Sequence, residues 1–301
     1  MTIALFYTEK NAEIARSLGA IMEKYDFPVH YFNTSGSQDS NEDPAVHIVL
    51  PSDISHVLFI YSTDEASRRY YYFYSGFCLG KGLRFLLLDT ENIKDKNDPF
   101  IHLGTMLTAD TFEEFILSEK IRFGQEEKVR RAKERLLERG ISCFPESFIT
   151  VVLSGDVSSA RIFLEAGFSS SLRDVRGVSI LSLAVRAQYP DMVRLLLDSG
   201  ANVNDIALDR GYSPLMDAAQ KSDEVMCRLL LEYGANVNLI SKDEQTALIL
   251  CAGRGDEKIS TLLFDHGADP TVKDALGMSA QGYAALFKNE KLTELFNTPR
   301  P

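Results

Sequence analysis

The 301-residue sequence contains no tryptophan, four cysteines and five histidines. The cysteines form no Cys-x-x-Cys pair, and the histidines show no His-x-x-x-His spacing. Structural zinc sites and helical metal-binding pairs usually carry those spacings. The sequence therefore predicts no metal site, no disulfide framework and no cofactor.

Positively charged residues are fewer than negatively charged ones. The 32 lysines and arginines stand against 43 aspartates and glutamates, which gives a formal net charge of -11. An acidic chain lacks the electrostatic footprint of proteins that bind nucleic acid or anionic membranes. We therefore expect neither as a partner.

Long apolar runs and targeting signals are missing as well. No stretch reaches the roughly 18 consecutive apolar residues of a membrane span. The opening sequence MTIALFYTEK has no basic segment followed by an apolar run, unlike a signal peptide. We expect a cytoplasmic protein in a reducing compartment.

Motifs for catalysis are not found either. GFCLGKGL contains glycines and a lysine but lacks the spacing and the hydroxyl residue of a phosphate-binding P-loop. Serine-containing turns such as GDVSSA lack the nucleophile-elbow pattern. The sequence by itself predicts no catalytic residue.

A repeated segment organises the second half of the chain. RLLLDSGANVN at 194–204 returns as RLLLEYGANVN at 228–238. The glycines that end such runs are 33, 34 and 33 residues apart; they are Gly167, Gly200, Gly234 and Gly267. A fixed period of this length is typical of stacked repeats, because one short unit cannot bury its apolar face alone.

The chemistry of one unit predicts two short helices. Ser213 or Thr246 precedes the first helix, where a hydroxyl can accept hydrogen bonds from free amides. Pro214 takes the first helical position, where its missing N–H costs nothing. The closing glycine suits a left-handed cap at the end of the second helix.

These features resemble the ankyrin repeat. GYSPLMDAAQ and the two GANVN endings carry the resemblance, which covers about 144–298 and comprises five units with a cap at each end. The third unit has one extra residue near Ile206–Leu208, which we expect in the hairpin loop. The resemblance implies an all-α solenoid that binds a protein partner through its hairpin tips and concave side. The candidate contact residues are Val175, Arg176, Asp209, Arg210, Tyr212, Lys242, Glu244, Leu276 and Met278.

The first 123 residues alternate apolar runs with helical patterns. Buried strands are predicted at 3–7, 29–32, 56–62 and 83–89. Helices are predicted at 9–25, 65–82 and 112–123. Strands that are apolar throughout and alternate with helices favour an α/β domain with a mostly parallel sheet.

This part resembles Toll/interleukin-1 receptor (TIR) domains and related flavodoxin-like folds. SDISHVLFIYSTDEAS and YSGFCLGKGLRFLLL carry the resemblance. It implies self-association or, in other members, cleavage of NAD or nucleosides by a glutamate. That glutamate would align at or next to Tyr74, where this chain has no carboxylate. Asp64 or Glu65 would have to replace it, so we expect no catalytic site here.

An aromatic segment, RRYYYFYSGF, lies in the same predicted helix. Aromatic side chains bury large areas, so one interpretation places most of them in the core or at a domain interface. The alternative is an exposed patch for self-association or for a ligand ring, with arginines to hold a phosphate or carboxylate. The candidate residues are Arg68, Arg69, Tyr70, Tyr71 and Tyr74.

A charged segment at 124–142 joins the two parts. Pairs such as Glu126 with Arg130 are four residues apart and support a helix. We therefore expect a TIR-like domain at 1–123, a connector helix at 124–142 and the repeat domain at 143–301. The favoured function is a non-catalytic adaptor that contacts partners through both domains. The alternatives are an NAD- or nucleoside-cleaving enzyme and a nucleotide sensor that does not turn its ligand over.

Overall fold

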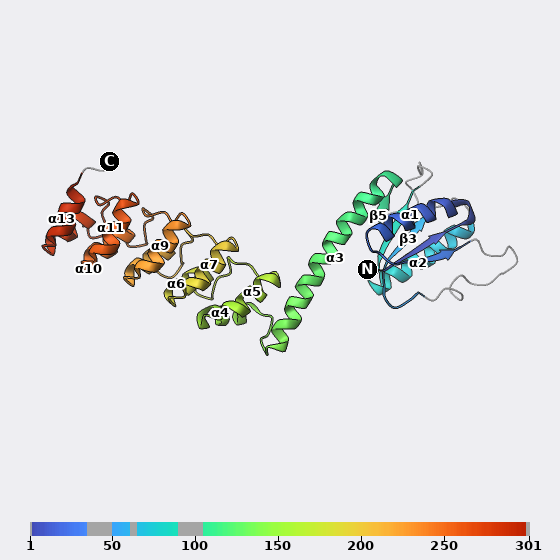
Figure 1. The fold of residues 1–301 in the computed structure, drawn as a ribbon, viewed down its shortest axis with the longest axis horizontal. Coiled ribbons are helices and arrows are strands. Elements are labelled where there is room, and N and C mark those ends of the chain that lie inside the picture. The colour runs from blue at the N-terminus through green and yellow to red at the C-terminus, as the bar shows by residue number, and fades with distance from the viewer. Residues whose placement is uncertain (1, 35–49, 61–64, 90–104, 299–301) are drawn as a thin grey trace. The chain divides into compact units, whose positions relative to one another are not determined.

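The computed structural model describes residues 2–34, 50–60, 65–89 and 105–298, without the side chains of residues 65–70. The chain divides into two compact units, Met1–Glu126 and Glu127–Pro301. The boundary falls inside helix α3, Ala109–Glu138 (Figure 1). We describe each unit by itself.

The first unit contains a five-stranded sheet in the order β2-β1-β3-β4-β5, and every pairing is parallel. In the register, Leu5 lies beside Tyr31 on one side and Leu58 on the other. The predicted parallel α/β domain is therefore confirmed. The strands are β1 (Thr2–Tyr7), β2 (Val29–Asn33), β3 (Ile54–Ile60), β4 (Arg84–Leu88) and β5 (Thr105–Leu107).

Helices cover both faces of this sheet. Successive residues of a strand point to opposite sides, so the strands present an apolar face to the helices on each side. Ile3 and Leu5 pack with residues of α1 and of α3. Ala4 and Phe6 pack on the other face with residues of α2. The helices of this unit are the short 3₁₀ helix η1 (Glu9–Asn11), α1 (Ala12–Lys24), α2 (Glu65–Lys81) and the first part of α3.

The aromatic segment of α2 contributes mainly to the core. Tyr71 is 3% exposed and Tyr74 is 1% exposed. The Tyr74 ring lies 4.7 Å from the ring of Phe6 on β1. Both tyrosines are therefore unavailable for the self-association predicted from the sequence. The side chains of Arg68, Arg69 and Tyr70 lie outside the described residues.

A charge cluster around the buried Glu119 fixes α3 to the amino-terminal ends of β3 and β4. Glu119 accepts hydrogen bonds from Arg84 (2.7 Å) and Arg122, and its Oε2 lies 3.1 Å from Nε2 of His56. His56 is 1% exposed, and burial lowers its pKa to about 4. A neutral His56 therefore donates to a carboxylate that two arginines keep charged.

Helix α3 is one continuous helix, where the sequence pattern predicted two. Gly124 in its interior costs about 1 kcal/mol relative to alanine. An ion pair between Arg122 and Glu126 spans this glycine, and a second pair with helical spacing, Arg130 with Glu134, follows it. Such pairs stabilise a helix and offset the glycine.

The second unit is a stack of helix pairs (Figure 1). Its described residues form five pairs: α4 (Pro145–Ser154) with α5 (Val157–Glu165), α6 (Ile180–Arg186) with α7 (Pro190–Asp198), α8 (Pro214–Gln220) with α9 (Glu224–Glu232), α10 (Ala247–Arg254) with α11 (Glu257–Asp265), and α12 (Ala280–Leu286) with α13 (Glu290–Asn297). One continuous apolar core runs through all five pairs. This is the predicted solenoid.

Hydroxyl caps start the first helix of four pairs. Ser213 accepts a hydrogen bond from the N–H of Met216, and Thr246 accepts one from Ile249, as predicted. Ser179 and Ser279 do the same in their units. Each such cap is worth about 1 kcal/mol, so the start of the first helix is fixed by local sequence in these four units.

Candidate protein-binding surface

Each hairpin tip is shaped by an aspartate or an equivalent polar residue. Oδ1 of Asp174 accepts hydrogen bonds from the N–H groups of Arg176 (2.9 Å) and Val178 (2.8 Å). Asp274 holds Leu276 and Met278 in the same way. Because the carboxylate accepts the backbone N–H groups of the turn from within, the side chains of Val175 and Leu276 at the two tips are left exposed.

The tips then join into one edge. The N–H of Leu208 donates to the carbonyl of Gly177, and Nζ of Lys242 donates to the carbonyl of Leu208. The N–H of Ala275 donates to Asp243 in the hairpin before it. Four hairpins are thereby linked in sequence, so their projecting residues form a continuous surface.

Apolar side chains project from this edge. Val175 is fully exposed (101%), Leu276 is 82% exposed and Leu208 is 61% exposed. Arg176, Lys242 and Glu244 are exposed beside them, and Met278 is half-buried. An edge of apolar residues with a charged rim is typical of a protein-binding surface.

Tyr212 does not belong to this surface. Its side chain is 6% exposed, and its hydroxyl lies 3.1 Å from Oε1 of Gln245 in the next unit. Tyr212 directly precedes the capping Ser213, as Val178 precedes Ser179, and Val178 is buried as well. The extra residue of the third unit lies within the tip Ala207–Tyr212, where the N–H of Ala207 donates to the carbonyl of Tyr212. The insertion is thus in the hairpin loop, as predicted, and Tyr212 closes it.

Asp209 and Arg210 enter a charge network behind the tips. Arg186 donates to Asp209 (2.6 Å) and to the buried Asp217 (2.8 Å), and Arg210 also reaches Asp217. The hydrogen bond from Arg186 lowers the pKa of Asp209 to about 2. Burial raises the pKa of Asp217 against the pull of both arginines. These ion pairs join the second unit to the third, so Asp209 and Arg210 are engaged within the repeat stack.

Glycine is required at Gly211, where two hairpins meet. Its φ is +70°, and a Cβ built there would lie 2.8 Å from the backbone nitrogen of Lys242. Side chains other than hydrogen are strained in both respects. The third and fourth tips therefore keep their close approach.

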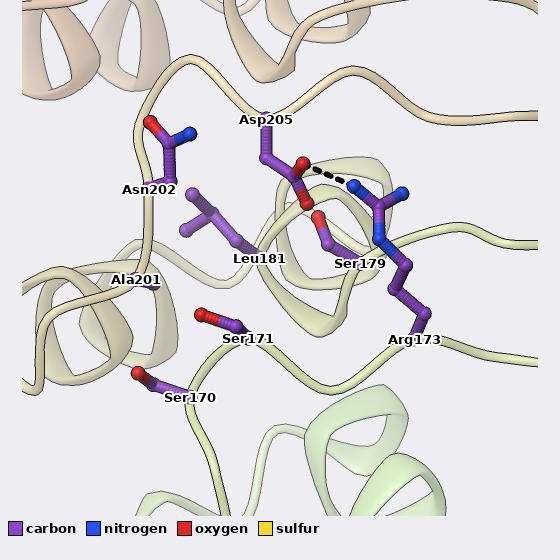
Figure 2. A pocket seen from close by; sticks show the side chains of 8 residues that line it. All are labelled: Ser170, Ser171, Arg173, Ser179, Leu181, Ala201, Asn202 and Asp205. Carbon is purple, nitrogen blue, oxygen red and sulfur yellow. Dashed lines mark hydrogen bonds and ion pairs between the residues drawn. The ribbon is translucent and has the colours of Figure 1, made fainter.

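A pocket of about 170 Å³ opens between two loops (Figure 2). One loop joins the first unit to the second, and the other joins the second unit to the third. Arg173 and Asp205 form an ion pair along one side of the pocket. The sequence analysis did not identify this pocket. Comparison of the four loops would have shown it, because Ser170 occupies the position of Val203 and Val237 after the closing glycine. The lining residues are Ser170, Ser171, Arg173, Ser179, Leu181, Ala201, Asn202 and Asp205.

The cysteines offer no reactive thiol in the buried regions. Burial raises the pKa of Cys78 and of Cys227 to about 12, and it raises the pKa of Cys251 well above the ordinary value. A thiolate is the nucleophile and metal ligand, so these groups are inert near neutral pH. Within the described residues, no group of His, Cys, Asp and Glu side chains is arranged to hold a metal ion.

In the same described part of the chain, no helix combines the length and the apolar character that a membrane crossing requires. The side chains of Asp64 and Glu65, which would have to supply a catalytic carboxylate, lie outside the description.

Comparison with known proteins agrees with the repeat structure. Residues 205–274 match the family model "Ankyrin repeats (3 copies)", and residues 176–207 match "Ankyrin repeat". A protein of Treponema pallidum (strain Nichols) named "Putative ankyrin repeat-containing protein" is 38% identical over 295 residues, which cover 98% of this chain and 99% of that protein. The chain belongs to the ankyrin-repeat proteins.

Proposed function

We propose that this protein is a non-catalytic adaptor whose ankyrin edge binds a partner protein. The exposure of Val175 and Leu276 on a hydrogen-bonded row of hairpin tips is the observation that carries the proposal. Fixing the tips in advance lowers the entropy cost of binding. Buried thiols at Cys78, Cys227 and Cys251 suit a reducing, cytoplasmic compartment.

The test replaces both apolar tip residues by charge. Val175→Asp with Leu276→Asp is expected to reduce partner capture by about tenfold or more. Each central residue of an interface contributes on the order of 1–2 kcal/mol to the binding free energy. Affinity capture from the native cell extract, quantified by mass spectrometry, measures the change. The matched control is Val225→Asp, because Val225 is 67% exposed on α9 and away from the tips. Equal loss in the control, or no loss in the double variant, contradicts the proposal.

For the N-terminal domain we propose a TIR-like role in self-association or in a second partner contact. Phe73 is the side chain of the aromatic segment that supports it, because it is 40% exposed while Tyr71 and Tyr74 are buried.

A nucleotide sensor is the second candidate function, and Thr8 favours it. Thr8 directly follows β1, where the strand order turns between β1 and β3, and ligands of open parallel sheets bind at such a point. Its hydroxyl is buried and has no hydrogen-bond partner among the residues that the structure describes. Thr8 is also the N-cap residue of η1 and makes no side-chain cap hydrogen bond there, and amides at a helix start favour anions.

Nucleotide addition is expected to stabilise the protein without product release. A ligand at about 100 times its Kd adds about 2.7 kcal/mol to the unfolding free energy. Thermal melting with NAD, AMP and ATP measures this, and chromatography checks for nicotinamide or free base. Thr8→Val should abolish the stabilisation by ligand. Unchanged melting with all three nucleotides rejects the sensor, and product release would favour the enzyme instead.

A further inference from the structure

A ladder of asparagines joins the loops of neighbouring repeats. Oδ1 of Asn204 accepts a hydrogen bond from the N–H of Asn236 (2.7 Å), and Oδ1 of Asn238 accepts one from Asp269 (2.8 Å). Each side chain lies four residues after the closing glycine of its unit. The loops are therefore tied together by a side-chain carbonyl at each of these two joints.

The ladder is broken one joint earlier. Ser171 stands at the position of Asn204 and Asn238, and its side chain is too short to carry the carbonyl across. The N–H of Asn202, the counterpart of the N–H groups of Asn236 and Asp269, has no acceptor among the described residues. This donor lies at the edge of the pocket, where it is exposed and accessible to a ligand.

The space for a missing side chain is present at the same joint. Ser170 replaces the valine found at 203 and 237, and its hydroxyl turns away to the carbonyl of Ser199 (2.9 Å). The pocket left behind measures about 170 Å³. A cavity of about 150 Å³ holds a benzene ring, so this one has room for a short polar side chain.

The walls supply acceptors as well as donors. Asp205 is 19% exposed in its side chain and uses Oδ1 for the ion pair with Arg173. Its Oδ2 accepts no hydrogen bond within the described part of the chain. The hydroxyl of Ser171 faces the same pocket (Figure 2). A ligand group there meets one N–H, one carboxylate oxygen and one hydroxyl.

We infer that this pocket binds the carboxamide side chain of an asparagine or glutamine from the partner protein. Its carbonyl accepts from the N–H of Asn202, as an asparagine carbonyl does at the next two joints. Its NH₂ group donates to Oδ2 of Asp205. The inference rests on the proposed function, because it names a group that the partner presents.

The charges of the pocket select a neutral group. A carboxylate would match Asn202 but would meet Oδ2 of Asp205, and two such oxygens repel each other. An ammonium or guanidinium would match Asp205 but would meet the N–H of Asn202 and the guanidinium of Arg173. A carboxamide has the donor and the acceptor together without charge.

The experiment follows the backbone amide of Asn202 by NMR in the ¹⁵N-labelled full-length protein. The probe is the blocked tripeptide Gly-Asn-Gly, compared with Gly-Asp-Gly and Gly-Leu-Gly. We expect a saturable downfield shift of the Asn202 amide proton with the asparagine peptide and binding at least about tenfold weaker for the other two, a difference of about 1.4 kcal/mol.

A second variant supplies the missing group from the chain itself. Ser171→Asn restores the residue of the next two joints, so it should shift the Asn202 amide without peptide and abolish the peptide response. Thr271→Asn is the matched control, because Thr271 has the same place in the last loop and lies away from the pocket; it should leave the peptide response intact. Absence of a shift in the unaltered protein, a response equal for all three peptides, or a response that survives Ser171→Asn overturns the inference. The titration reports on the pocket alone, whereas partner capture by the tip variants reports on the proposed function, so the two fail separately.

Discussion

Replacement of Glu119 by alanine is expected to lower the unfolding free energy of the N-terminal unit by about 1–3 kcal/mol. The carboxylate is 5% exposed and holds Arg84, Arg122 and His56 together. Its removal leaves the ring N–H of the buried His56 without an acceptor, whereas the partly exposed arginines can turn to water. A buried donor that loses its partner costs its full desolvation free energy.

Hydrogen exchange at the amides of β3 and β4 measures this loss, because both strands carry residues of the cluster. The control is Glu113→Ala, whose carboxylate pairs with Lys24 on the surface at 2.6 Å. Exposed ion pairs contribute little, so the control should behave like the unaltered protein. Equal protection in both variants would show that the cluster does not stabilise the sheet.

Replacement of Phe148 by alanine is expected to cost about 3–5 kcal/mol in the first repeat. The Phe148 ring is fully buried and is stacked on Phe163 with 4.9 Å between centroids. The cavity left by a ring this size is too large for its neighbours to fill. In a stack where each repeat touches only its neighbours, the damage should stay at one end.

Hydrogen exchange resolved by peptide tests both statements. Protection should fall in α4 and α5 and persist in α10 and α11. Phe144→Ala is the matched control, since Phe144 is 64% exposed just before α4. Uniform loss of protection along all five helix pairs would mean that the repeats unfold as a single cooperative block.

The repeat unit could be predicted from sequence because its signals are local and recur in register. Ser213, Pro214 and the closing glycines each fix a helix start or end through their own backbone chemistry. The parallel sheet was also readable, because its four long strands are apolar. The fifth strand, Thr105–Leu107, escaped prediction because it has three residues, of which two are exposed.

The finer details depend on contacts between distant residues. Burial of most of RRYYYFYSGF was one of the two interpretations, but the segment alone does not say that Tyr71 and Tyr74 are the residues that face the sheet. That outcome follows from the partners Phe6 and Phe59 on strands far away in the sequence. Tyr212 was assigned to the surface for the same reason, since Gln245 lies 33 residues away.

The candidate surface shows the same division. Val175 and Leu276 were found because the position of a tip within the repeat predicts exposure. The pocket was missed because it depends on departures from the pattern, at Ser170 and Ser171. Places where a sequence breaks its own local rule are where function is expected.

The extra residue in the hairpin of the third unit has a consequence for how the sequence of this chain can vary. It is confined to the tip Ala207–Tyr212, while Ser213 still caps its helix and Asn204 still reaches the next loop. The tip therefore tolerates a change in length that leaves the spacing of the stack untouched. Residues of the proposed binding surface can therefore be added or exchanged one hairpin at a time while the helix stack remains constant.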